Sequence, residues 1–229
     1  AGIYALDPAE VEHWRENVEA GNLYVNRGIT GAIVRRQAFG GWKRSVVGPA
    51  AKAGGPNYVA SLGWWEPAED DDRSAFIAGC RQAWAEMGKA IDGSGLVAES
   101  NVFRYRPLRT VAICVGDGVP KSTVDLAVAA AGVAGTEAVV VTPAELASRA
   151  ADGQQFVKVR LLGEVGDEVR LAAIDAGLWV DDTPVAKDPR REMLRWAHEQ
   201  AVSESRHRHG NITPRRPGLA AWPAPARTS

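Results

Sequence analysis

Residues 21–65 combine glycine with positive charge in a way that could receive a small anion. This segment holds nine glycines and six basic side chains, and the chain has no acidic residue between Glu19 and Glu66. The basic residues are Arg27, Arg35, Arg36, Lys43, Arg44 and Lys52. Glycine permits close approach of the backbone to a ligand, and cations without nearby carboxylates create a positive field. Two interpretations stay open here, an anion-receiving wall or a set of turns with solvated basic side chains.

No residue in the chain has the surroundings of a catalytic nucleophile. Cys80 and Cys114 lie far apart and in no paired spacing, so a disulfide framework is not expected and a reducing cytoplasm fits the chain. Neither cysteine lies in an electropositive loop of the kind that lowers a thiol pKa. The serine-hydrolase pattern GxSxG and the zinc pattern HExxH do not occur.

Composition sets few limits on function. The chain has 229 residues and a net charge of −1, so overall charge gives no argument for nucleic acid or membrane. No apolar run reaches the ~18 residues of a membrane span. The N-terminus AGIYALDPAE has no initiator Met and no signal-like apolar core. We therefore expect a fragment of a longer chain.

The first 104 residues predict two helices, short strands and a long loop. A cap at Asp7 followed by Pro8 begins a helix that should stop at Gly21. Residues 23–25 and 32–34 read as buried strands, and residues 38–63 as loop. The acidic residues 69–72 precede a helix expected over residues 74–91. The helix dipole explains this acidic run more simply than a metal site does.

From Val111 onward, strands and helices alternate, which predicts an α/β fold with a mainly parallel sheet. Strands are expected at residues 111–115, 138–142, 157–162 and 178–182. The intervening helices should begin with a Ser122 to Asp125 capping pair and with a Thr142 to Glu145 capping box. After Asn211 the sequence has no periodicity, and a flexible tail is expected over residues 212–229.

Two polar motifs in this half are weak signals. In VGDGVPKS, Lys121 stands where a dinucleotide motif needs glycine, and Pro120 removes an N–H donor from the helix start. A structural turn is the favoured interpretation. In ESRHRHGN, His207 and His209 are two residues apart and do not share a helix face. A docking segment over residues 206–211 is favoured over a metal site.

The segment GNLYVNRGITGAIVRRQAFGGWKRSVVGPAAKAGGPNYV resembles the C-terminal part of the catalytic domain of L-glutamate γ-semialdehyde dehydrogenases. These enzymes are also called Δ1-pyrroline-5-carboxylate dehydrogenases and belong to the aldehyde dehydrogenase superfamily. NVFRYRPL and EQAVSESRHRHGN resemble the additional domain of the long bifunctional proline utilization A proteins.

The resemblance implies an α/β fold in four parts. Residues 1–65 would be a C-terminal piece of an aldehyde dehydrogenase catalytic domain, and residues 66–104 a helical connector. Residues 105–211 would be a Rossmann-like, aldehyde dehydrogenase-like auxiliary domain without cofactor, and residues 212–229 the tail.

The resemblance also implies chemistry, most of it encoded before the matched region. In the family a cysteine attacks the aldehyde, hydride passes to NAD, and water activated by a glutamate releases L-glutamate. We therefore expect no catalytic, cofactor-binding or metal-binding residue here and no activity of the chain alone. FAD is expected only in an upstream proline dehydrogenase half.

The substrate-binding residues implied here are Gly31 and Ala32, whose backbone N–H groups would bind the substrate α-carboxylate, and Phe39, which would line its aliphatic chain. Ala38 departs from the family, which usually has Pro before FGG.

The implied partners are the upstream catalytic domains and the substrate, in a homo-oligomer, with the last motif helping to close a passage for the intermediate. Nucleic acid is not expected. One alternative is a non-catalytic interaction or scaffold module. The weakest is an anion- or nucleic-acid-binding protein that uses the aromatic residues Tyr24, Phe39, Trp42 and Tyr58.

Overall fold

The computed structural model describes residues 1–30, 32–33, 36–46, 51–68, 72–150, 156–208, 211–212 and 220–221. Its helices are α1 (Pro8–Asn17), α2 (Arg73–Met87), α3 (Lys121–Ala134), α4 (Pro143–Ala150), α5 (Asp167–Asp175) and α6 (Pro189–Met193), with 3-10 turns η1 (Lys43–Ser45), η2 (Val59–Leu62) and η4 (Leu194–Trp196). Its strands are β1 (Gly2–Ile3), β2 (Asn22–Val25), β3 (Ile91–Asp92), β4 (Glu99–Pro107), β5 (Thr110–Val115), β6 (Glu137–Val141), β7 (Lys158–Leu162), β8 (Trp179–Asp181), β9 (Ala197–Ser205), β10 (His207–Arg208), β11 (Asn211–Ile212) and β12 (Ala220–Ala221).

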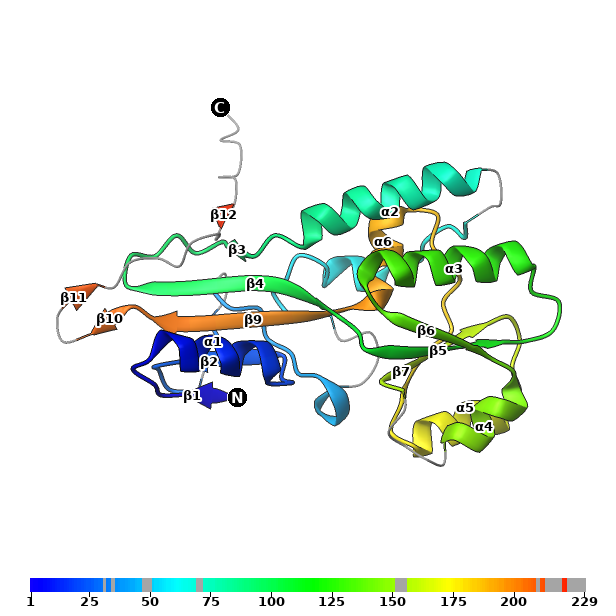
Figure 1. The fold of residues 1–229 in the computed structure, drawn as a ribbon, viewed down its shortest axis with the longest axis horizontal. Helices are drawn as coiled ribbons and strands as arrows, with labels where there is room; N and C mark the ends of the chain where they lie inside the picture. The colour runs from blue at the N-terminus through cyan, green and yellow to red at the C-terminus, as the bar shows by residue number, and fades with distance from the viewer. Residues whose placement is uncertain are drawn as a thin grey trace.

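One sheet joins the two ends of the chain. Its order is β1-β2-β9-β4-β3-β12, with β9 parallel to β2 and antiparallel to β4. Figure 1 shows β4 and β9 as a long ribbon that runs from this sheet to the other half of the molecule. The glycine-rich N-terminal part is therefore completed by strands that come late in the sequence.

The second sheet confirms the α/β fold class. Its order is β6-β5-β7-β8 and all its pairs are parallel. The apolar side chains of α2, α3 and α6 form one core with this sheet, and those of α4 and α5 form another. Figure 1 shows these two groups of helices on opposite faces. The strand order reverses at β5 and β7, where ligands bind in open α/β sheets.

The predicted helix at the N-terminus is confirmed and the predicted strand at residues 32–34 is wrong. Asp7 caps α1 by accepting a hydrogen bond from the Ala9 N–H at 2.8 Å, but α1 ends at Asn17, before Gly21. Ala32 and Ile33 are irregular, and Val34 lies outside the described residues. The Ile33 carbonyl accepts hydrogen bonds from the N–H groups of residues 36 and 37, so the chain turns where a strand would continue.

The two predicted caps in the second half have opposite outcomes. Thr142 and Glu145 form the capping box, with the Thr142 N–H donating to Glu145 Oε2 at 2.8 Å and the Glu145 N–H to Thr142 Oγ1 at 3.3 Å. The Ser122 cap is wrong, because α3 begins at Lys121 with Pro120 as its N-cap. The Asp125 carboxylate instead accepts from Lys121 Nζ at 2.8 and 2.9 Å.

Secondary-structure elements cross the expected part boundaries. The second predicted helix, α2, runs from Arg73 to Met87 and is capped by Asp72, which accepts from the Ala75 N–H; residues 69–71 lie outside the described ones. The connector also contains β3 and most of β4, and β4 crosses the expected boundary at 104/105. Within the expected tail, β12 pairs with β3 in parallel. β3, β4 and β12 form by pairing with strands far away in the sequence, so no local pattern predicts them.

Candidate functional site

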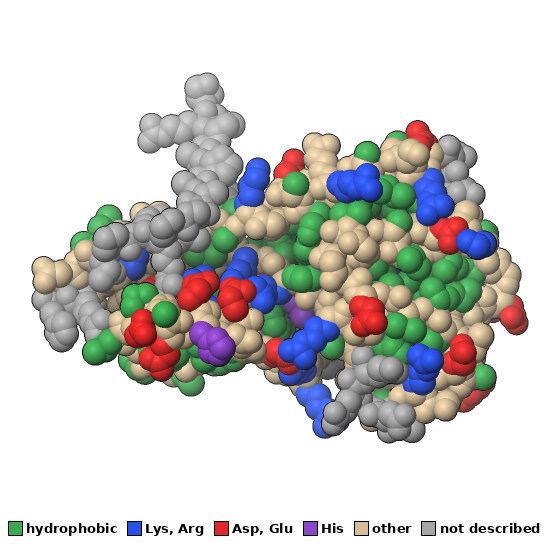
Figure 2. All heavy atoms as spheres, in the orientation of Figure 1, with side chains coloured by type: hydrophobic (Ala, Val, Ile, Leu, Met, Phe, Trp, Pro, Cys, Tyr) green, Lys and Arg blue, Asp and Glu red, His purple; other side chains and the backbone are tan. Residues whose placement is uncertain are grey.

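Carboxylates from distant parts of the sequence reach the basic residues of the glycine-rich segment. Lys43 pairs with Glu19, and Glu99 on β4 lies 3.4 Å from Arg27 and 3.6 Å from Arg36. Figure 2 shows acidic and basic side chains interspersed over the visible face. Folding therefore brings counter-charges from other parts of the sequence to three of the six basic residues.

The aromatic residues of the same segment divide between core and surface. Tyr24 and Trp42 are 3% and 8% exposed, whereas Phe39 and Tyr58 are 59% and 44% exposed. Base stacking needs accessible ring faces. Burial of two of these four rings counts against the nucleic-acid alternative.

The backbone on both sides of Phe39 is held by hydrogen bonds. Phe39 and Ala53 exchange two main-chain bonds of 3.0 and 2.9 Å. The Asn22 side chain on β2 donates to the Ala38 carbonyl at 3.1 Å and accepts from the Gly40 N–H at 3.2 Å. The Phe39 ring nevertheless stays exposed, so the fold fixes its base and leaves its face free for contact.

Lys52 is buried beneath this loop. Its Nζ donates to Asn22 Oδ1 at 2.8 Å and to the Gly40 carbonyl. Burial lowers the Lys52 pKa to about 8, partly opposed by Glu199. Gly21 lies against the same place, where an added Cβ would stand 2.3 Å from the Gly40 carbonyl oxygen. Only glycine permits this close approach.

Glu199 on β9 holds the other side of the loop. Its Oε2 accepts from the Lys52 N–H and its Oε1 from Asn57 Nδ2, both at 2.7 Å. Its backbone carbonyl accepts from Trp42 Nε1 at 2.8 Å. Burial raises the Glu199 pKa, although the bonds from Lys52 and Asn57 act in the opposite direction. Sequence reasoning missed this role, because the only available signal was the place of Glu199 in EQAVSES.

A second polar cluster anchors the start of the segment to β9. Ser203 accepts from Arg27 at 2.6 Å and from Gln37, and donates to Asn101 Oδ1 on β4 at 2.6 Å. Gln37, Asn101 and Ser203 are all buried. The motifs GNLYVNR, QAFGG and AGGPNY therefore meet on one strand from the far end of the chain.

The predicted substrate residues are placed unequally. Gly31 lies outside the described residues. Ala32 is half-buried in irregular backbone next to it, and Phe39 is exposed in the held loop. Carboxylate binding by the amides of residues 31 and 32 stays a prediction.

Neither cysteine is placed for nucleophilic chemistry. Cys80 and Cys114 are buried free thiols. Burial, helped by Glu192, raises the Cys80 pKa to about 12, and burial raises the Cys114 pKa to about 11. Both stay protonated near neutral pH. The described residues also contain no group of three His, Cys, Asp or Glu side chains that could hold a metal ion.

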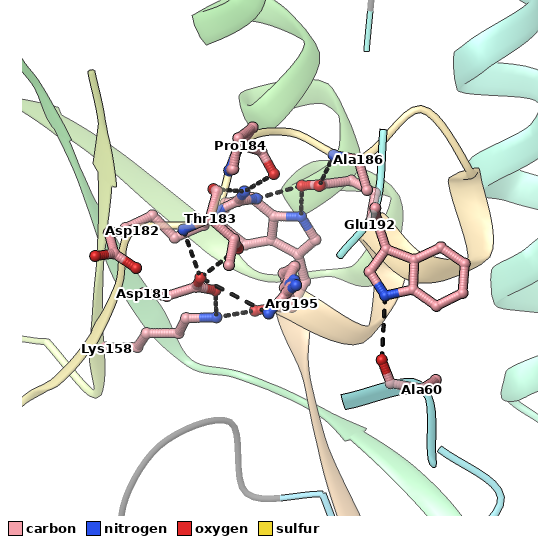
Figure 3. A network of polar contacts seen from close by, with 12 residues as sticks. Ala60, Lys158, Asp181, Asp182, Thr183, Pro184, Ala186, Glu192 and Arg195 are labelled. Carbon is pink, nitrogen blue, oxygen red and sulfur yellow. Dashed lines mark hydrogen bonds and ion pairs between the residues drawn. The ribbon is translucent and has the colours of Figure 1, made fainter. Parts of the chain in front are cut away.

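A cavity of about 380 Å³ lies between residues 60–65, the end of β8, the segment from α6 to η4 and the start of β9. Trp64, Trp65 and Trp179 line it, together with Asp181 and His198. The Trp65 indole N–H donates to the Ala60 carbonyl at 3.2 Å (Figure 3). The cavity therefore has three tryptophans in its wall, with the carboxylates of Asp181 and Asp182 on the β8 side.

Asp181 on the β8 side of the cavity belongs to a network of buried charges (Figure 3). Lys158 Nζ lies 2.6 Å from Asp181 Oδ2 and donates to the Arg195 carbonyl at 2.8 Å. Burial opposes ionisation of Asp181, but Lys158 and Arg160 outweigh it and hold the pKa of that carboxyl well below its usual range. The charges of Lys158 and Asp181 therefore neutralise each other. Their contacts connect β7 and β8 to the residues that lead into β9.

Arg160 and Glu192 continue this network into the core. The Arg160 guanidinium donates to Glu192 Oε1, which also accepts from Trp196 Nε1 at 2.9 Å. Glu192 Oε2 accepts from the Ala186 N–H at 2.9 Å. Arg160, Glu192 and Trp196 are fully buried. Removing one partner of such a pair leaves an uncompensated charge, so the network fixes α6 on the four-stranded sheet.

Two turns meet in the crevice of the four-stranded sheet, where a Rossmann domain would hold its dinucleotide. The turns after β5 and β7 meet in an antiparallel bridge between Asp117 and Glu164. A Cβ added at Gly116 would stand 2.1 Å from the Glu164 carbonyl oxygen, so the two turns lie directly against each other at the carboxyl ends of β5 and β7. The helix that follows has Pro120 at its N-cap, and proline has no N–H to offer a phosphate.

Part of the predicted docking segment is used inside the chain. Arg206 is 8% exposed, and its side chain donates to the Val97 carbonyl at 2.8 Å. His207 and Arg208 pair with Ile212 and Asn211 in the β10–β11 hairpin. Residues 209 and 210 lie outside the described ones.

Among the helices that the structure describes, none has the length and hydropathy of a membrane span.

The sequence matches one protein family and several known proteins. Residues 1–62 match the aldehyde dehydrogenase family. The chain is 56% identical over 58 residues to a 1-pyrroline-5-carboxylate dehydrogenase from Bacillus cytotoxicus, covering 25% of this chain and 11% of that protein. It is 34% identical over 103 residues to the bifunctional protein PutA from Rhizobium meliloti, covering 45% of this chain and 8% of that protein.

The fold is similar to the solved structure of proline utilization A (PutA) from Corynebacterium freiburgense, with a TM-score of 0.75 and 41% identity. That match covers 92% of this chain and 23% of the solved chain. The matched regions thus span a quarter or less of each of these relatives. The resemblance of the sequence to aldehyde dehydrogenases and proline utilization A proteins is confirmed.

Proposed function

We propose that this chain forms part of an NAD-dependent L-glutamate γ-semialdehyde dehydrogenase that oxidises the semialdehyde to L-glutamate in proline catabolism. Residues 1–65 would belong to its catalytic domain and supply one wall of the substrate site. The nucleophile and the NAD-binding domain would come from elsewhere in the enzyme, where NAD accepts the hydride. The chain alone should then be inactive.

The observation that supports this proposal best is the convergence of three motifs around an exposed ring. Asn22 from GNLYVNR makes hydrogen bonds to the residues on either side of Phe39 in QAFGG, and Phe39 exchanges main-chain hydrogen bonds with Ala53 of AGGPNY. These are the motifs that resemble semialdehyde dehydrogenases. A held backbone with a free aromatic face is suited to a short aliphatic chain, which gains by apolar contact.

We assign substrate recognition to Gly31, Ala32 and Phe39. The N–H groups of residues 31 and 32 would bind the α-carboxylate, since backbone donors make charge-assisted hydrogen bonds to carboxylates. Phe39 would line the aliphatic carbons next to the aldehyde. This chain would thereby position the substrate, while the nucleophile, the proton-transfer group and the NAD that accepts the hydride would lie outside it.

The four-stranded half would act as an auxiliary domain that binds no cofactor and helps to seal a passage for the intermediate. The bridge between Asp117 and Glu164 supports the first part of this assignment. A flavin would belong to a proline dehydrogenase half elsewhere in the polypeptide. A purely scaffolding role for this half remains the alternative, and it predicts normal transfer of the intermediate when the half is removed.

A Phe39→Ala variant of the enzyme that carries this chain tests the substrate wall. The variant should raise the KM for the semialdehyde about tenfold, because a lost apolar contact costs roughly 1–3 kcal/mol, and should leave the KM for NAD unchanged. Production of L-glutamate and NADH is measured in the steady state. Leu171→Ala is the matched control, since Leu171 is 57% exposed on the other half of the molecule.

Two results would count against this assignment. A wild-type enzyme that does not form L-glutamate from the semialdehyde removes the proposed reaction. Equal KM values for wild type and Phe39→Ala, in an enzyme that performs the reaction, would remove only the role of Phe39.

A further inference from the structure

We infer that Glu199 is a positioning residue for the substrate wall, acting through Lys52, Asn57 and Ala53 on Phe39. The inference rests on the proposed function and extends it to a residue about 160 positions away from Phe39 in the sequence. It concerns the KM for the aldehyde substrate and leaves the chemistry to other residues.

The first step is the clamp that Glu199 makes. Its two carboxylate oxygens bind two different points of one loop, the N–H of Lys52 and the amide of Asn57, at 2.7 Å each. Asn57 Nδ2 also donates to the Tyr105 hydroxyl at 2.6 Å. Lys52, Asn57 and Glu199 are 0%, 4% and 8% exposed. Buried bonds to a charged acceptor are strong and costly to lose.

The second step carries this clamp to Phe39. Ala53 directly follows Lys52 and exchanges both of its main-chain hydrogen bonds with Phe39. A shift of the Lys52 N–H therefore moves Ala53, the residue that Phe39 pairs with in an isolated bridge. The Lys52 side chain acts in the same direction, since its Nζ holds the Gly40 carbonyl next to Phe39.

The third step is the rigidity of the strand that bears Glu199. β9 lies inside its sheet, paired with β2 on one side and along all nine residues with β4 on the other. Trp42 adds an anchor, because its indole N–H donates to the Glu199 carbonyl and its ring stacks on His198 at 4.4 Å. The loop that contains Lys52 and Asn57 is therefore attached to a rigid strand, as precise substrate positioning requires.

A reciprocal swap separates positioning from general stability. In Glu199→Gln the new amide N–H₂ faces the Asn57 amide, so two donors oppose each other. In Asn57→Asp two carboxylates oppose each other. In the double variant the amide introduced at position 199 can donate to the carboxylate introduced at position 57. The amide oxygen at position 199 still accepts from the Lys52 N–H, and the total charge is unchanged.

The test uses the enzyme that carries this chain, with steady-state oxidation of the semialdehyde. Each single variant should raise the KM for the semialdehyde about tenfold, within the range known for misplaced binding groups. The KM for NAD should stay unchanged. The double variant should return to within about twofold of wild type on restoring both hydrogen bonds. Amide hydrogen exchange at Phe39 and Ala53 should accelerate in the single variants and recover in the double variant.

Glu192→Gln is the matched control. Glu192 is also a buried glutamate that accepts from a backbone N–H and from side chains, but it lies in the core of the other half. This variant should lower the melting temperature without changing the KM for the semialdehyde. If Glu199→Gln does not fold, Asn57→Asp and the double variant provide the same comparison.

Three outcomes decide the inference. Raised KM values in the single variants with recovery in the double variant support it. Unchanged KM values, or a double variant no better than the single ones, overturn it while the proposed reaction stands. A wild-type enzyme without semialdehyde oxidation overturns both, and this outcome is distinguished by the wild-type assay alone.

Discussion

Buried titratable side chains gather where β9 meets the glycine-rich segment. Burial lowers the pKa values of Lys52 and His198 and raises that of Glu199. Each of these shifts favours the uncharged form of the side chain. For His198 the positive field of Lys158 adds to burial and the pKa falls to about 4. The His198 ring stacks on Trp42 with an angle of 19° between the planes. The imidazole is therefore neutral at physiological pH.

This neutral histidine should make the chain sensitive to acid. The unfolded chain binds a proton at His198 near pH 6.5, whereas the folded chain does so only near pH 4. Between these values the unfolded state binds more protons, so the free energy of unfolding rises with pH and falls on acidification. The loss should reach about 3 kcal/mol at pH 4.

His198→Phe removes the titration and keeps the stacked ring. Urea unfolding of wild type and variant from pH 4 to 7 should give stability curves that diverge below pH 6.5, with the variant less affected by acid. Parallel curves would show that another group controls this range. The difference between the two curves cancels the opposite contribution of Glu199, whose pKa is raised.

The position at which a helix begins determines which residue caps it, as α3 and α4 show. Thr142 and Glu145 exchange hydrogen bonds at the start of α4. At α3 the N-cap is Pro120, and no described side chain caps that end. Serine and acidic residues three apart are thus an incomplete signal, since the helix start fixes which residue can cap.

Thr142→Ala should destabilise α4 by about 1 kcal/mol, because it removes the acceptor for the Glu145 N–H. Ser122→Ala is the matched control and should change the stability by less than about 0.5 kcal/mol, as for a substitution that removes no cap. Thermal unfolding measures both, and amide exchange at Leu146 localises the effect to α4. A loss for Ser122→Ala as large as that for Thr142→Ala would contradict this assignment of the caps.

Periodic local patterns predicted most of the α/β half, and the failures have both local and long-range causes. Strands such as β5 and β7 are continuous apolar or buried runs between turns, which local sequence reveals. The turn at Ile33 could not be predicted, because it depends on carbonyl bonds to residues 36 and 37. Phe39 was found through its motif, but the bond between Lys52 and Glu199 was not, since these two residues lie 147 positions apart.

At the scale of the whole molecule, the last long strand completes the first sheet. β9 connects β2 from the N-terminal part with β4 from the middle of the chain. Leu23, Val102 and Val202, one from each strand, form a buried cluster. The Arg160–Glu192 network fixes the segment before β9 to the other sheet. The glycine-rich segment and the four-stranded half are therefore joined through the residues that lead into β9.

This topology predicts that the N-terminal strand depends on β9. The Tyr24 N–H donates to the Ala1 carbonyl, and alternate N–H groups of a strand point to opposite neighbours. The N–H groups of Leu23 and Val25 must then face β9. In a chain that ends at Trp196, these two amides should exchange hydrogen at the rate of unstructured backbone, while Ile113 in β5 stays protected. A chain that ends at Arg208 keeps β9 and should protect all three. Slow exchange at Leu23 and Val25 without β9 would mean that the N-terminal part folds independently, and the dependence of the Phe39 loop on Glu199 would lose its structural basis.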